Sequence, residues 1–146
     1  MPNSQRGTFT GGQPLPVAER TLTRETIRAY ADASGDHNPI HIDPEAAKAA
    51  GFPDVIAHGM LLLVYITDFL DAAFNAALRQ DGALKLRFRA PAHPGDHLTI
   101  SGTIRDARQE DSGDQSITCD VELRRQDGTV LVTGQATVAL PAQSQA

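Results

Sequence analysis

The stretch that decides the fold is Gly59–Phe74, which reads GMLLLVYITDFLDAAF. Its first half, from Met60 to Ile66, is apolar at nearly every position, so a helix formed here has almost no polar face. A helix that is apolar all round is normally surrounded by protein. We therefore expect a long central helix and not a surface one. The apolar run is much shorter than the roughly 18 residues that a membrane span requires, so no membrane segment is expected.

Downstream of this helix the sequence changes to the alternating pattern of β-strands. Apolar and basic residues alternate over 84–89, which reads LKLRFR and predicts a strand with one buried face. A second alternating run covers 117–123, and two further strand-like runs cover 98–104 and 130–138. Asp127-Gly128 between two of these runs is typical of a hairpin turn.

Upstream of the helix we expect a short strand over 15–22 and then a helix that starts at the N-cap Thr23 and stops at Gly35. Asp43-Pro44 begins a second short helix, because it supplies an N-cap followed by a first-turn proline. Together the elements predict an α+β domain in which one central helix packs against an antiparallel sheet of about five strands.

The length of 146 residues and a composition that is 40% hydrophobic and 21% charged indicate a single globular domain. We place it at 14–140, between a flexible N-terminal segment at 1–13 and a C-terminal tail at 141–146. The net charge of −5 argues against a nucleic-acid partner, which requires a basic face. The single cysteine, Cys119, excludes a disulfide framework, and the first residues lack the apolar core of a signal peptide, so we expect a cytoplasmic protein.

Two motifs lie before and at the start of the central helix. The first, at 34–43, reads SGDHNPIHID and places Asp36 five residues before His41 on a loop stiffened by glycine and proline. The second, at 56–60, reads IAHGM and opens the helix with a glycine, where backbone N–H groups can meet a ligand. An acid, an imidazole and a positively polarised helix end are the groups needed to move water onto or off a double bond conjugated to a carbonyl.

These motifs, with the later Phe88-x-x-Pro91-x-x-x-Gly95-Asp96 step, resemble the signature of MaoC-like hydratases and dehydratases over about residues 12–140. That family includes (R)-specific enoyl-CoA hydratases and 3-hydroxyacyl-carrier-protein dehydratases. The resemblance implies a hotdog fold, in which a curved antiparallel sheet wraps a long central helix. It also implies a lyase that hydrates trans-2-enoyl thioesters to (R)-3-hydroxyacyl thioesters, or catalyses the reverse dehydration.

The resemblance further assigns the main site residues. It implies that Asp36 and His41 form a catalytic dyad, and that N–H groups around Gly59 hold the thioester carbonyl. Some (R)-specific hydratases carry a serine six residues beyond the histidine of the His-Gly-Met motif. Here that position is Val64, which shifts the comparison toward the dehydratases.

The roles of individual motif residues are less sharply defined. We assign water activation to Asp36 and proton relay to His41, but the sequence does not orient the imidazole and the reverse assignment stays open. Asn38 is expected to tie the loop through its amide, as a structural or a catalytic support. His58 and Met60 flank the helix-opening glycine and are expected beside the substrate; for His58 we favour a structural role over a catalytic one.

Lys85, Arg87 and Arg89 form a basic stripe along one face of the expected strand. These cations suit the phosphates of CoA or an acidic carrier protein, although a solvated strand face gives the same pattern.

Four loop side chains have metal-ligand chemistry, but proline interrupts the loop between the histidines, and no regularly spaced ligand set emerges. These four are Asp36, His37, His41 and Asp43. We expect no metal, and no cofactor apart from the CoA or carrier that bears the substrate.

Two other functions remain alternatives to the hydratase or dehydratase. A hotdog thioesterase would release a free thiol, and a non-catalytic acyl-binding or partner subunit would turn nothing over. The presence of both dyad residues speaks against the second. The family implies a homodimer with pockets near the interface, and a heterodimer with a dyad-lacking partner stays open. The sequence leaves open the acyl length, the choice of CoA or carrier protein, the pathway and the direction of reaction.

Overall fold

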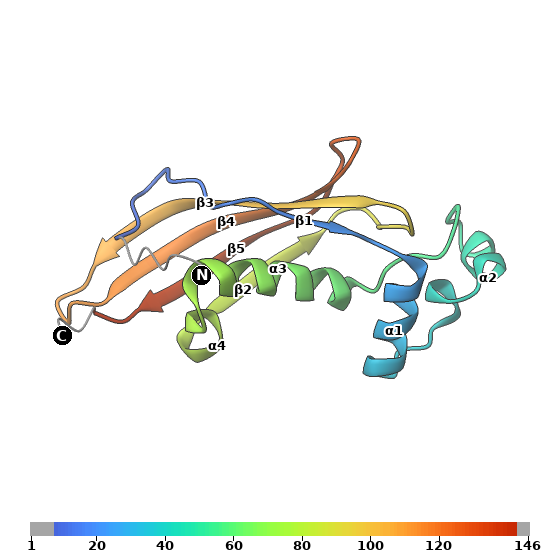
Figure 1. Ribbon diagram of the computed structural model, residues 1–146, viewed down its shortest axis with the longest axis horizontal. Coiled ribbons are helices and arrows are strands. Elements are labelled where there is room, and N and C mark those ends of the chain that lie inside the picture. Colours follow the sequence, from blue (N-terminus) through green and yellow to red (C-terminus); the bar gives the residue numbers. More distant parts are fainter. Residues whose placement is uncertain (1–7, 143–146) are drawn as a thin grey trace.

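A five-stranded antiparallel sheet forms the larger part of the computed structural model, which describes residues 8–142. The strands are β1 (Ala18–Thr21), β2 (Ala83–Phe88), β3 (His97–Gln109), β4 (Gln115–Arg125) and β5 (Val130–Leu140). Their order across the sheet is β1-β3-β4-β5-β2, and every neighbouring pair is antiparallel. Figure 1 shows this sheet arched over the long helix α3 (Gly59–Phe74).

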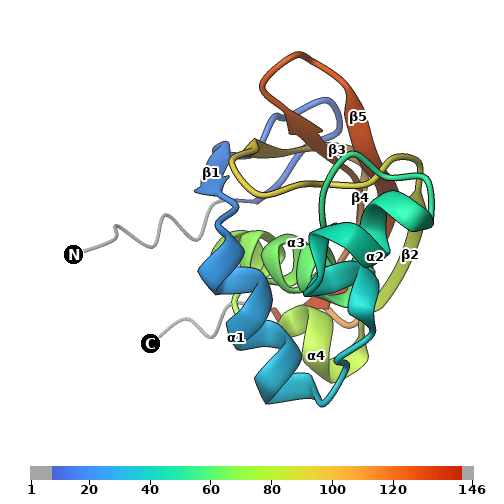
Figure 2. The same ribbon diagram turned by 90° about the vertical axis from the view of Figure 1, so that its right-hand side faces the viewer.

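The remaining helices are short and lie at the two ends of α3 (Figures 1 and 2). They are α1 (Arg24–Ser34), the 3-10 turn η1 (Pro39–His41), α2 (Pro44–Ala49) and α4 (Ala77–Asp81). The first three gather where α3 begins, which is where both sequence motifs lie. The predicted α+β fold, with a central helix on one antiparallel sheet of five strands, is confirmed. Two short elements, η1 and α4, were not predicted from the sequence.

One side of α3 is covered by the sheet, but the other is open. Leu62, Ile66 and Leu70 are buried in the core. By contrast, Met60 is 58% exposed and Val64, one turn further on, is 39% exposed. The expectation that the helix is enclosed on every side is therefore wrong for the single chain. The sequence pattern cannot tell a side chain covered by its own chain from one that is open in the isolated chain.

Two strand glycines make room for side chains that pack closely on the sheet. A Cβ on Gly102 of β3 would lie 2.9 Å from the Phe69 ring of α3. A Cβ on Gly134 of β5 would lie 2.4 Å from Leu86 of β2. Both positions therefore require glycine, because real Cβ atoms do not approach other atoms this closely.

The first strand is shorter than the predicted 15–22. Pro14 forms only an isolated bridge with Thr103, and proline at 14 and 16 cannot donate to a strand ladder, so regular pairing starts at Ala18.

Residues 1–7 and 143–146, within the segments predicted to be a flexible lead-in and a tail, lie outside the described part. Phe9 packs edge-on against Phe74, with ring centroids 5.2 Å apart. Within the described range, no helix combines the length and the apolar character that crossing a membrane requires.

Candidate active site

The end of α1 sets the direction of the first motif. Thr23 caps the helix by accepting a hydrogen bond at Oγ1 from Thr26 N, at 3.0 Å. Gly35 ends the helix in the left-handed conformation with φ of 79°, and its N–H donates to Ala31 O at 2.9 Å. A side chain at this position would be strained, so the glycine predicted as the stop is needed to turn the chain directly into Asp36.

Short-range hydrogen bonds then hold the loop from Asp36 to His41. Asp36 Oδ1 accepts from Asn38 N at 3.2 Å, and Asn38 Oδ1 accepts from Ile40 N at 3.3 Å. The main-chain oxygen of Asn38 accepts from His41 N at 3.0 Å, which closes η1. Asn38 thus caps the turn that carries His41, and Pro39 occupies its first position. The spacing of the motif places the carboxylate and the imidazole on opposite ends of one compact turn.

The His41 ring is fixed at one edge by the second motif. Its Nδ1 lies 2.7 Å from Ile56 O. Since a carbonyl only accepts, Nδ1 carries a hydrogen, which leaves Nε2 as the ring nitrogen that can take up or release a proton. The Ile56 N–H in turn donates to Ile40 O at 3.1 Å. Ile56 therefore binds the first motif through both its carbonyl and its N–H group.

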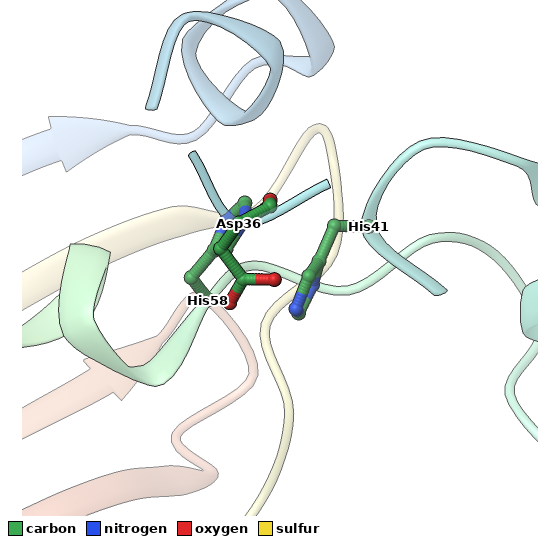
Figure 3. A group of neighbouring side chains, drawn as sticks. All are labelled: Asp36, His41 and His58. Atoms are coloured by element: carbon green, nitrogen blue, oxygen red, sulfur yellow. The ribbon is translucent and has the colours of Figure 1, made fainter. Parts of the chain in front are cut away.

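His58 lies directly against this pair. It is the N-cap residue of α3, is only 2% exposed, and donates from Nε2 to Asp36 O at 2.9 Å. Its ring stacks on His41, with centroids 3.8 Å apart and planes 25° apart. One nitrogen or oxygen atom from each of Asp36, His41 and His58 lies within 4.8 Å of the other two. Figure 3 shows the Asp36 carboxylate directed toward the His41 ring, with His58 behind it.

This group of three side chains has the donor chemistry of a metal site, but not the geometry. Imidazole lone pairs lie in the ring plane, and the nearly parallel planes of His41 and His58 do not converge on one ion. Of the loop residues weighed as ligands, His37 instead lies 2.9 Å from Asp32, and Asp43 caps α2 through Glu45 N. The arrangement suits proton transfer better than it suits metal binding.

The start of α3 offers main-chain donors beside the pair. The carbonyl of His58 accepts from the N–H of Leu61 at 3.0 Å, whereas the N–H groups of Gly59 and Met60 find no acceptor within residues 8–142. Such free donors at a helix N-terminus attract a developing negative charge. A Cβ on Gly59 would lie 3.4 Å from the Phe88 ring, so this ring lies directly beside the start of the helix. Phe88 is itself 51% exposed, and Met60 and Val64 on the first turns of α3 are also exposed; these three apolar side chains are called the exposed apolar strip below.

The basic stripe lies elsewhere. Lys85 and Arg87 point to the outer face of the sheet, away from α3, because the alternating Leu84 and Leu86 pack against the core. There they line a groove of about 630 Å³ together with Arg89. None of these three cations forms an ion pair with another described residue. The structure does not bring the stripe together with Asp36 and His41.

A second hollow, of about 440 Å³, has His41 in its wall. It lies along the outward side of α1, where Arg24 and Arg28 contribute to the lining. Arg24 is held by an ion pair with Asp54, and this hydrogen-bonded guanidinium lowers the pKa of the Asp54 carboxyl. The pair ties the start of α1 to the segment that precedes His58.

Two contacts had no signal in the sequence, one inside this site and one outside it. The contact of His58 with both dyad residues is not visible in the motif, which shows only a histidine before a glycine. His93 carried no signal either, yet its Nδ1 donates to Val55 O at 3.1 Å, next to the carbonyl that holds His41. For Tyr30 the sequence did carry a signal, because its helical spacing from Ile27 predicts a side chain that points inward. In the structure the Tyr30 ring packs edge-on against His58, with ring centroids 4.9 Å apart.

Known proteins match this chain over most of its length. A family model described as a MaoC like domain matches residues 6–126. The mitochondrial 3-hydroxyacyl-acyl-carrier-protein dehydratase of Arabidopsis thaliana is 33% identical over 125 residues, covering 84% of this chain and 72% of that protein. The 3-hydroxyacyl-thioester dehydratase Z of Mycobacterium tuberculosis is 33% identical over 133 residues, covering 85% and 80%.

A solved structure gives the same result in three dimensions. The (R)-hydratase from A. caviae involved in PHA biosynthesis superposes with a TM-score of 0.75 at 29% identity, covering 91% of this chain and 98% of that one. The resemblance inferred from the motifs is thereby confirmed, because the family model spans both motifs and the structural match covers 91% of the chain. The chain belongs to the MaoC-like domain family.

Proposed function

We propose that the chain is a hydro-lyase that adds water to trans-2-enoyl thioesters to give (R)-3-hydroxyacyl thioesters, or removes it in the reverse direction. The observation that carries this proposal is the meeting of the Asp36 carboxylate with the His41 ring beside the start of α3. The curated relatives named as dehydratases and the structural relative named as a hydratase support the same reaction class.

The proposed reaction needs one proton to travel from water to C2 of the substrate. Asp36 takes the proton as the water oxygen bonds to C3, and the electrons of the double bond move toward the thioester carbonyl. The free Nε2 of His41 receives the proton from the carboxyl group and delivers it to C2, so both residues return to their starting state. In the opposite assignment, His41 takes the proton from water first; the same two groups are used.

Main-chain donors complete the proposed site. The unpaired N–H groups of Gly59 and Met60 would hold the thioester oxygen, where negative charge develops as the enolate forms. The acyl chain would lie on the exposed apolar strip of Met60, Val64 and Phe88. We further propose that a second copy of the chain covers this strip in a homodimer, as the family resemblance implies. Light scattering of the isolated protein separates this from a heterodimer that needs a different partner.

The outer-face groove is the proposed site for the phosphates that accompany the thioester. Lys85, Arg87 and Arg89 have no ion-pair partner within residues 8–142, although the chain carries a net charge of −5. The carboxylates in the same groove, Asp120 and Glu122, are paired with Arg105 and Arg124, so the three cations stay available to an anionic ligand. Both CoA and the phosphopantetheine arm of a carrier protein supply such phosphates.

The test is incubation with crotonyl-CoA and with longer enoyl-CoA thioesters. We expect loss of the absorbance of the conjugated thioester and formation of the (R)-3-hydroxy product, without release of free thiol. Release of thiol would show a thioesterase instead. Absence of any change with every acyl length, on CoA and on a carrier protein, would identify a non-catalytic acyl-binding or partner subunit.

A further inference from the structure

His58 is a buried titratable side chain for which the proposed reaction gives no role. Its ring lies between two others, edge-on to Tyr30 at 4.9 Å and stacked on His41 at 3.8 Å. Its side chain is 2% exposed, and its Nδ1 has no hydrogen-bond partner in the described structure. Leaving a buried polar atom unpaired destabilises the folded state, so the other contacts of this ring must account for an imidazole at this position.

The hydrogen bonds of His58 determine where its hydrogen lies. Nε2 is 2.9 Å from the main-chain oxygen of Asp36, and this oxygen can only accept. Nε2 therefore carries the hydrogen. A hydrogen on Nδ1 would meet no acceptor and would point into a buried environment, so the geometry selects the ring with its hydrogen on Nε2 alone.

We infer that His58 is a positioning residue that holds both members of the acid–base pair at once. Its Nε2–H fixes the main chain of Asp36, and the face of its ring fixes the plane of His41, whose Nδ1 edge is already bound to Ile56 O. The side chain need not touch water or substrate in this role. The inference rests on the function proposed above for Asp36 and His41.

Two substitutions separate the hydrogen bond from the packing. His58→Phe keeps a flat ring to stack on His41 but loses the donor to Asp36. His58→Gln loses the ring but keeps an N–H at about the reach of Nε2. We expect kcat of H58F to fall by roughly 10- to 100-fold, because a misplacement of about 1 Å at a reacting group costs about 100-fold. KM should change little, and H58Q should recover part of kcat.

A double variant tests whether His58 acts through Asp36. If the role of His58 is to place the carboxylate, removing its donor in an enzyme that already lacks this carboxylate should cost little more. H58F combined with D36N should therefore have nearly the kcat of D36N alone. A merely structural role predicts instead that the two losses multiply.

His93→Phe is the matched control, because it also removes an imidazole donor to a backbone carbonyl. His93 donates to Val55 O at 3.1 Å and makes no hydrogen bond to Asp36 or His41. We expect H93F to lose stability but to keep a kcat close to that of the wild type. A folded state in every variant is checked by circular dichroism and thermal unfolding.

Nitrogen-15 NMR of the imidazoles gives a readout that needs no turnover. We expect the His58 hydrogen on Nε2, and we expect the His41 resonances to move in H58Q, which loses the stacked ring, but not in H93F. A hydrogen on Nδ1 of His58, a wild-type kcat in H58F, or multiplying losses in the double variant would overturn the inference. If the wild type turns over no thioester, the proposed function fails instead, and the NMR comparison still decides whether His58 positions His41.

Discussion

Arg24 and Asp54 make a two-point ion pair across thirty residues of sequence, with Nη1–Oδ1 at 3.2 Å and Nη2–Oδ2 at 2.8 Å. Arg24 opens α1, and Asp54 lies four residues before His58. The hydrogen bond from Arg24 is the largest cause of the lowered pKa of Asp54, and the N–H of Val55 adds to it. Because the ion pair requires the ionised Asp54 carboxylate, the contact between α1 and the segment before the second motif depends on pH.

Asp54→Asn should lower the melting temperature near neutral pH, by a small amount because the pair is partly exposed. The folded pKa of Asp54 lies below its unfolded value, so the carboxylate contributes stability above the unfolded pKa, about 4. That contribution is lost as pH falls through the lower, folded value. The difference between wild type and D54N should therefore shrink in melts taken from pH 7 down to pH 3. A difference in melting temperature that stays constant over this range would contradict this prediction. The control is Asp68→Asn, because Asp68 is exposed and its carboxylate makes no hydrogen bond within residues 8–142.

Asp36→Asn should lower kcat by at least about 100-fold, a typical contribution of a general acid or base. Asparagine keeps the shape of the side chain and an oxygen that can accept from Asn38 N, so the loop should keep its fold. The measurement is the initial rate on crotonyl-CoA. His37→Gln is the control, because His37 lies next to Asp36 in sequence but pairs outward with Asp32. Near-normal turnover in D36N would disprove the assignment of the carboxylate.

Replacing Lys85 and Arg87 together by alanine should raise KM several-fold for crotonyl-CoA and leave KM unchanged for crotonyl-N-acetylcysteamine, which has no phosphate. The effect on the CoA substrate should weaken with added salt, because exposed charges are screened. Arg108→Ala is the control, since Arg108 is exposed but paired with Asp106 at 2.7 Å. An equal increase in KM for both substrates would argue against phosphate binding in the outer-face groove.

Gly102→Val should destabilise the protein by about 1–3 kcal/mol, the usual cost of overpacking a core. The new Cβ would lie 2.9 Å from the Phe69 ring and would push α3 away from the sheet. Urea unfolding measures the change. Gly11→Ala serves for comparison, because its Cβ would meet only Arg105 O at an ordinary 3.5 Å. Equal stability of the two variants would show that α3 can shift without cost.

The thiol of Cys119 should be inert in the folded protein. It is fully buried in β4, and burial raises its pKa to about 11. A thiol reagent at pH 8 should therefore react only after unfolding in urea, where the thiolate becomes accessible. Rapid reaction in the native state would mean that β4 opens readily.

Much of the fold was predictable because its signals are local. The apolar run over 59–74 and the alternation over 84–89 each report one element and its buried side, and both elements form as predicted. The start of β1 was predicted too early, since the apolar residues of 15–22 outweighed the prolines that interrupt the pairing. The open side of α3 was not predictable, because an apolar side chain looks the same in sequence whether its own chain covers it or not.

The same difference between local and long-range signals applies to the candidate active site. Asp36 and His41 are five residues apart, so their meeting follows from one short turn and could be read from the motif. The stacking of His58 on His41 depends on how α3 enters the loop from a distance of 17 residues, which no local pattern encodes. The alternation that placed Lys85 and Arg87 on one strand face gave no information on which face looks toward the dyad.

The adjacent carbonyls of Val55 and Ile56 each anchor an imidazole, from His93 and His41 respectively. Main-chain oxygens are present whatever the side chain, so this anchorage is indifferent to the identity of the residues that provide it. Ile56 can therefore be exchanged for another apolar residue while the acid–base machinery stays where it is, whereas Val55 is fully buried and any exchange there changes the packing of the core. The half-buried side chain of Ile56 is thus a position where the surface beside His41 can vary without loss of the anchor.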